Sequence, residues 1–107
     1  MNNKVLIKVY APEFDKVFDV YIPVNYLVWK INKMLAKCIG DLCDYDIDLR
    51  QEFLLINKLT NEIYGNNTIV RNTNIRKGTE LIIITKQKWL LKKSVKRYKI
   101  KLIVEDY

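Results

Sequence analysis

Three aspartates at alternate positions are the first candidates for chemistry in this sequence. Asp44, Asp46 and Asp48 have the spacing that opens a calcium-binding loop, in which carboxylate oxygens from alternate residues ligate the cation. Such a loop also needs a glycine at its sixth position and a glutamate at its twelfth, where this sequence has Leu49 and Leu55. The aspartates therefore predict a solvated connector and no metal site.

The two cysteines, Cys38 and Cys43, are the only other candidate ligands of note. Their spacing places them on different faces of a helix, which argues against a disulfide between them. The sequence has no histidine, and a closed zinc site needs four ligands, so the thiols are expected to be buried or inert. Neither a nucleophile motif nor a glycine-rich phosphate loop is present. We expect a protein that is not an enzyme, with no cofactor and no small-molecule substrate.

Length and composition favour one small globular domain with a basic extension. The chain has 107 residues, half of them hydrophobic, and no apolar run long enough to span a membrane. We expect a cytoplasmic protein, with the inner face of the membrane as a second location. The net charge is +7, and residues 86–107 hold eight basic and two acidic residues, or +6. The first 85 residues are therefore almost neutral, and the extension carries the charge.

The N-terminal third of the sequence alternates with the period of two that is typical of strands. One run covers residues 4–10 and a second covers residues 17–22, separated by turn residues around Pro12 and ended by Pro23. Together they predict a hairpin. One face of it would carry the alternating apolar residues Val5, Ile7, Val9, Phe18, Val20 and Ile22.

A change to helical spacing follows from about Tyr26. Asn25 is a plausible N-cap, and Gly40 with the acidic stretch beyond it is expected to end the helix. The predicted buried stripe consists of Leu27, Val28, Ile31, Met34, Leu35, Cys38, Ile39 and Leu42.

The second half of the chain predicts further strands. The apolar run 53–56 suits a central strand of undecided facing, the residues around Ile63 suit a short strand, and residues 80–85 form the last strand after a turn at Lys77 and Gly78. The order β-β-α-β-β-β fits an α+β fold, in which one mixed sheet packs on one helix. In it, the first and last strands lie side by side.

The segment from Asn67 to Leu81 resembles the region before the final strand in ubiquitin-like domains. There, two aliphatic residues bracket a turn, and a lysine-glycine turn begins the last strand. The resemblance makes Ile69 and Ile75 the two aliphatic plugs, and it makes Leu81 and Ile83 inward-facing. It implies a ubiquitin-like β-grasp domain over residues 1–85, followed by the extension 86–107.

Within that superfamily, the chain looks most like the YukD/EsaB group of type VII secretion accessory proteins. The features shared with this group are the opening strands, the Ile22-Pro23 step into the helix and the Asn57-Lys58 stretch. Conjugated β-grasp proteins end in Gly-Gly, whereas this sequence ends Glu105-Asp106-Tyr107, so covalent tagging is not expected. The resemblance implies a role in binding proteins, with a membrane component of the secretion machinery as one partner.

If the alternate residues of the strands face the helix, Leu6, Tyr10, Ile82 and Ile84 face away from it beside Val17 and Tyr21. An aliphatic outer face implies a cover: the extension, a second copy of the chain or another protein. The extension is expected to form a helix over residues 86–98 and then a strand. The residues predicted to bind a protein partner are Leu6, Tyr10, Ile82, Ile84, Trp89, Lys92, Lys93, Lys96 and Arg97.

The basic extension also admits other partners. Lysines and arginines interleaved with Trp89 and Tyr98 suit phosphates, so nucleic acid and an anionic membrane surface are the alternative ligands. A homodimer is a further form of the protein contact. The nucleic-acid alternative predicts affinity that falls steeply with salt and is lost when residues 86–107 are removed.

Overall fold

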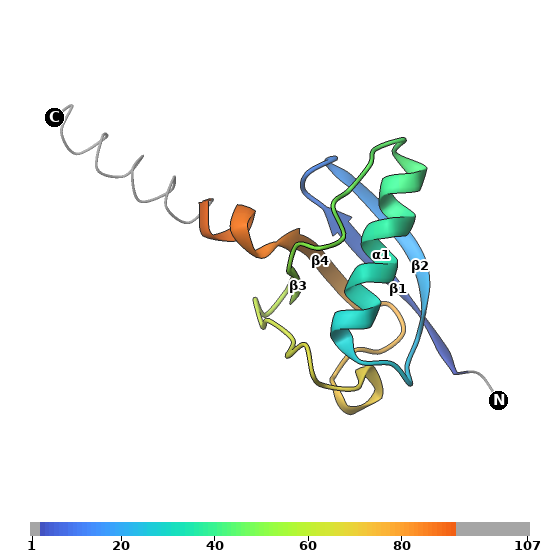
Figure 1. Ribbon diagram of the computed structural model, residues 1–107. Helices are drawn as coiled ribbons and strands as arrows, with labels where there is room; N and C mark the ends of the chain where they lie inside the picture. Colours follow the sequence, from blue (N-terminus) through green and yellow to red (C-terminus); the bar gives the residue numbers. More distant parts are fainter. Residues whose placement is uncertain (1–2, 92–107) are drawn as a thin grey trace, which may run out of the picture.

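One helix lies across one face of a four-stranded mixed sheet in this protein (Figure 1). The computed structural model describes residues 3–91. The strand order in the sheet is β2-β1-β4-β3. The elements are β1 (Lys4–Ala11), β2 (Lys16–Pro23), α1 (Val28–Leu42), β3 (Phe53–Asn57), a short 3₁₀ helix (Val70–Asn72) and β4 (Glu80–Thr85). Residues 86–91 are helical, as expected for that part of the extension.

The centre of the sheet joins the two ends of the domain. β1 pairs antiparallel with β2 over its whole length and parallel with β4, where Val9 lies opposite Leu81. The predicted hairpin and the predicted contact between first and last strands are both confirmed. Ile7, Val9, Leu81 and Ile83 are buried against the helix, because alternate residues of a strand point to the same face.

The start of α1 is capped by backbone groups and not by a side chain. The N-cap is Leu27, which makes no side-chain cap, so the prediction of Asn25 as N-cap was wrong. The amide N–H of Val28 donates to the Thr68 carbonyl (2.9 Å), and that of Trp29 donates to the Asn66 carbonyl (3.1 Å). Two of the free N–H groups of the first turn are thereby satisfied.

The buried stripe of α1 is rotated relative to the prediction. It includes the polar or small residues Asn32, Ala36 and Gly40, while Met34, Cys38 and Leu42 are exposed. The helix ends at Leu42, within the predicted region, so Gly40 itself lies inside the helix. The connector after the helix folds back against Gly40. A Cβ atom on Gly40 would come 2.8 Å from the Tyr45 carbonyl oxygen. The connector can approach the helix this closely because Gly40 has no side chain.

β3 is an edge strand of the described sheet and not a central one. Its outer edge is covered by its own following loop, since Ile56 makes an isolated bridge with Ile63 and the Tyr64 N–H donates to the Leu55 carbonyl (3.0 Å). The short strand expected around Ile63 is reduced to that bridge. Asn57 holds the loop, because its Oδ1 accepts from the N–H groups of Leu59 and Thr60.

Two aliphatic residues of the segment before β4 are buried in the core. One of them differs from the prediction. Ile75 is buried as predicted, but the second plug is Val70, while Ile69 is half-buried and bridges to Leu27. The turn into β4 is at Gly78, whose φ of +84° is easily reached only by glycine. The lysine-glycine turn is confirmed.

Candidate protein-binding surface

The sheet face turned away from α1 carries an apolar row that crosses all four strands. We call this the outer face. The strand pairing places Val17 beside Tyr10, Tyr10 beside Ile82, and Ile82 beside Ile56. Two further apolar pairs, each spanning two strands, lie on the same face: Leu6 with Tyr21 and Ile84 with Leu54. The outer face therefore brings together Leu6, Tyr10, Ile82 and Ile84, the four sheet residues predicted to bind a partner.

Exposure on the outer face rises toward β2. Leu6, Tyr10, Ile82 and Ile84 are all half-buried by their neighbours. Val17 is 58% exposed on β2, which is the edge strand of the described sheet on this side. An apolar row with one exposed end is the type of surface that binds proteins.

The contribution of β3 to the outer face was not found from the sequence. Its four consecutive apolar residues gave no periodic signal, so its facing stayed undecided. The pairing with β4 resolves it, because Leu54 lies opposite Ile84 and Ile56 lies opposite Ile82. Phe53 and Leu55 point to the core, whereas Leu54 and Ile56 belong to the outer face.

Polar groups fix the apolar row in place. Lys8 lies between Asp19 and Glu80 in the strand pairing and makes an ion pair with Asp19 at 2.9 Å. The Tyr10 hydroxyl donates a hydrogen bond to Asp15 Oδ1 at 2.9 Å, which holds the ring across the hairpin. This bond raises the pKa of Tyr10, since deprotonation would remove the proton that Asp15 accepts, with smaller contributions from desolvation and from the Asp15 charge.

Replacing Asp15 by asparagine should lower the pKa of Tyr10 toward its ordinary value. The variant removes the carboxylate charge, and asparagine tolerates the positive φ of 51° at this position. The measurement is an NMR titration of the Tyr10 ring carbons in the wild type and in the variant. An unchanged Tyr10 titration would mean that the Asp15 carboxylate does not contact the Tyr10 hydroxyl.

Hydrogen bonds and ion pairs connect the first turn of the extension to the end of the sheet. The Lys88 N–H donates to Thr85 Oγ1 (3.2 Å), so Thr85 acts as a helix cap. Lys86 makes an ion pair with Glu52 (3.2 Å), and Lys88 makes one with Glu13 in the β1–β2 turn. Trp89 is half-buried. The other predicted residues of the extension, Lys92, Lys93, Lys96 and Arg97, lie outside the described residues.

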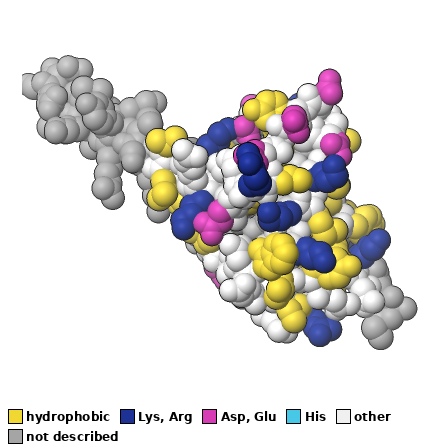
Figure 2. Space-filling model, in the orientation of Figure 1, with side chains coloured by type: hydrophobic (Ala, Val, Ile, Leu, Met, Phe, Trp, Pro, Cys, Tyr) yellow, Lys and Arg dark blue, Asp and Glu magenta, His cyan; other side chains and the backbone are white. Residues whose placement is uncertain are grey.

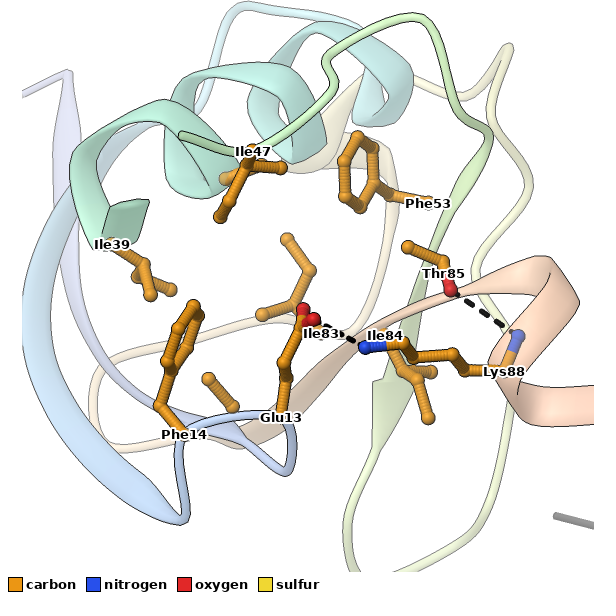
Figure 3. A pocket seen from close by; sticks show the side chains of 11 residues that line it. Glu13, Phe14, Ile39, Ile47, Phe53, Ile83, Ile84, Thr85 and Lys88 are labelled. Carbon is orange, nitrogen blue, oxygen red and sulfur yellow. Dashed lines mark hydrogen bonds and ion pairs between the residues drawn. The ribbon is translucent and has the colours of Figure 1, made fainter. Parts of the chain in front are cut away.

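A small apolar cavity lies next to these contacts (Figure 3). Its volume is about 30 Å³, enough for a water molecule but not for a metabolite. Phe14, Ile39, Ile47 and Phe53 point into it, and the Glu13–Lys88 ion pair stands at its rim (Figure 3). The cavity is therefore a packing space at the end of the core.

The residues first considered for chemistry are dispersed. Asp48 is bound by Arg50, whose guanidinium lowers the pKa of that carboxyl mainly through their hydrogen bonds. Cys38 is exposed, so its place in the predicted buried stripe of the helix was wrong, and Cys43 is half-buried. Within residues 3–91, no three potential ligands form a metal cluster, and no helix is long and apolar enough to cross a membrane.

No protein family model and no curated protein matches this sequence. Solved structures do match the fold. The EccD5 ubiquitin-like domain from Mycobacterium xenopi aligns with a TM-score of 0.63 and 11% identity, over 78% of this chain and 96% of that one. A chain of the MycP5-free ESX-5 inner membrane complex aligns with a TM-score of 0.65 and 16% identity, over 78% of this chain and 21% of that one.

A third match comes from an enzyme assembly. A chain of the toluene 4-monooxygenase HD complex aligns with a TM-score of 0.66 and 6% identity, over 78% of this chain and 99% of that one. At these identities, the alignments establish the fold alone. The mixed sheet on one helix and these neighbours together show that the chain has the ubiquitin-like β-grasp fold.

Proposed function

We propose that this protein is a non-enzymatic ubiquitin-like binding protein that contacts a partner protein through its outer face and its basic extension. The observation that carries the proposal is the apolar row Val17–Tyr10–Ile82 on the side away from α1, which continues into the buried Ile56 on β3. A sheet face exposed only to water normally carries polar residues at these positions. The aliphatic and aromatic side chains therefore favour a protein contact.

The partner that we propose is a component of a type VII secretion machinery. The support is the fold that the chain shares with the EccD5 ubiquitin-like domain and with a chain of the ESX-5 inner membrane complex. In this proposal, residues 1–85 form the binding domain and residues 86–107 form a basic extension that adds to the contact at the cytoplasmic side of the membrane. The contact is non-covalent, with the outer face supplying apolar anchors.

The experiment is affinity capture from the native host with the full chain as bait. Val17→Asp places a charge at the exposed end of the apolar row, and Leu59→Asp places the same charge on a loop residue that is 81% exposed. We expect the wild type and Leu59→Asp to capture secretion membrane components, and Val17→Asp to lose them. Circular dichroism verifies that both variants fold.

Two results would contradict the proposal. One is the capture of the same proteins by Val17→Asp, which would remove the outer face from the contact. The other is an adduct that survives denaturing electrophoresis, which would mean covalent attachment.

The nucleic-acid alternative has less support in the described part of the extension. Lys86 and Lys88 are each paired with a carboxylate of the domain, so their charge is partly neutralised before any phosphate could bind.

A further inference from the structure

The exposed face of α1 carries a basic stripe bordered by apolar side chains. Trp29 is 41% exposed on one side of the stripe, and Met34 is equally exposed on the other. Helical spacing places Lys30, Lys33 and Lys37 between them. Figure 2, which views the molecule from the α1 side, shows hydrophobic and basic side chains interleaved over this region. The face therefore combines apolar anchors with positive charge.

Two of the three lysines of the stripe, Lys30 and Lys33, carry uncompensated charge, whereas Lys37 pairs with Asp41 at 3.8 Å. Within residues 3–91, no carboxylate lies within ion-pairing distance of Lys30 or Lys33. The Lys30 ammonium lies 5.0 Å from the centre of the Tyr26 ring, and the Lys33 ammonium donates to the Leu49 carbonyl at 2.6 Å. These contacts orient the two lysines without an ion pair. The Lys33 charge acts on Asp48, but Arg50 already holds that carboxylate, so the face is complementary to an acidic ligand.

A cleft opens beside Trp29, between α1 and the start of β3. Its volume is about 80 Å³, enough for an apolar side chain of moderate size. The lining includes Trp29, Asn32, Lys33, Gln51, Phe53 and Asn66. The lining carboxylate of Glu52 is engaged by Lys86 at 3.2 Å, which reduces its repulsion of an acidic ligand.

Asn32 provides the independent sign of a ligand in this cleft. Its side chain is 2% exposed, and its Nδ2 group donates to the Phe53 carbonyl (3.1 Å) and to Asn66 Oδ1 (3.3 Å). These two bonds fix the amide orientation, because only the NH₂ end can donate. The Asn32 Oδ1 atom is buried and has no hydrogen-bond partner within the described part of the chain. A buried acceptor without a donor is unfavourable, and Asn32 is one of the lining residues, so a ligand that parts the cleft wall and brings an N–H group to Oδ1 would satisfy it.

From these features we infer that the cleft beside Trp29 binds an acidic segment of another protein. One apolar side chain of that segment enters the cleft against Trp29 and Phe53, and one of its N–H groups donates to Asn32 Oδ1. Its carboxylates lie beside Lys30 and Lys33. This site is on the helix side of the sheet, opposite the outer face, so it is separate from the surface in the proposed function and holds or fails independently of it.

The test is a selection of phage-displayed random peptides on the full chain. Wild-type protein is the bait, and the Trp29→Ala variant is used for counter-selection. We expect the enriched peptides to combine several acidic residues with one apolar residue. Their affinity should fall at least about tenfold with Trp29→Ala and with Lys33→Glu, as for central contact residues. It should remain unchanged with Val17→Asp on the outer face and with Lys58→Glu, an exposed lysine away from the cleft.

NMR of the side-chain amides tests the contact with Asn32 directly. A hydrogen bond accepted by Oδ1 should shift the Asn32 Cγ and Nδ2 resonances when an enriched peptide is added. The inference is overturned if no peptide is enriched over counter-selection, or if the enriched peptides are basic or neutral. It is also overturned if Asn32 does not respond, which would indicate a water molecule only, or if an oligonucleotide displaces the peptides.

Discussion

Replacing Leu55 by alanine is expected to lower the free energy of unfolding by about 2–5 kcal/mol. Leu55 is 0% exposed and points from β3 into the core between the sheet and α1. Its removal loses the transfer free energy of the buried methyl and methylene groups and leaves a cavity that the surrounding core only partly fills. The measurement is urea denaturation followed by circular dichroism. A loss this large would take a substantial share of the stability of a small domain.

The control for this prediction is Leu59→Ala. Leu59 is only four residues further along the chain but is 81% exposed in the loop after β3. The same chemical change there should alter the free energy of unfolding by no more than about 0.5 kcal/mol. Equal effects of the two variants would mean that β3 does not pack as the structure describes.

Gly40→Val should destabilise the domain by about 1–3 kcal/mol, the usual cost of overpacking. A Cβ atom at this position would lie 2.8 Å from the Tyr45 carbonyl oxygen and 3.1 Å from the Ile47 Cδ1 atom. The backbone oxygen cannot rotate away as a side chain can, because the Tyr45 N–H is itself bonded to the Gly40 carbonyl at 2.8 Å. The connector must therefore move away from the helix, and thermal melting reports the cost.

Cys38→Val is the matched control for the effect of a β-branched residue in the same helix. Cys38 is exposed, and cysteine and valine have similar helix propensities, so this variant should melt close to the wild type. If Gly40→Val melts with it, the close approach of the connector to the helix does not exist.

The strands and their facing were largely predictable from the sequence, because alternation in β1, β2 and β4 encodes which residues meet the helix. Ile7, Val9 and Leu81 were assigned correctly on this basis. Periodicity could not predict which residues of β3 face the helix, because four apolar residues follow one another there. Only the pairing with β4 shows that Leu54 lies on the outer face.

The helix was harder to predict, for a different reason. Its buried stripe contains Asn32 and Gly40, which hydropathy treats as surface or breaking residues. Asn32 is buried because the Phe53 carbonyl and Asn66 accept its amide protons, and Gly40 because the connector that follows the helix folds back against it. Neither contact follows from the helical spacing of apolar residues. The cleft beside Trp29 was missed for the same reason, since its walls come from three distant segments.

The place of β4 in the sheet has a consequence for how the protein is made. β4 is the last strand of the described residues, yet it lies between β1 and β3. A nascent polypeptide that has not yet exposed Glu80–Thr85 holds the β1–β2 hairpin and β3 with no strand to join them. The described sheet can therefore be completed only after Glu80–Thr85 has emerged, and before then one edge of β1 and one edge of β3 lack the strand that pairs with them.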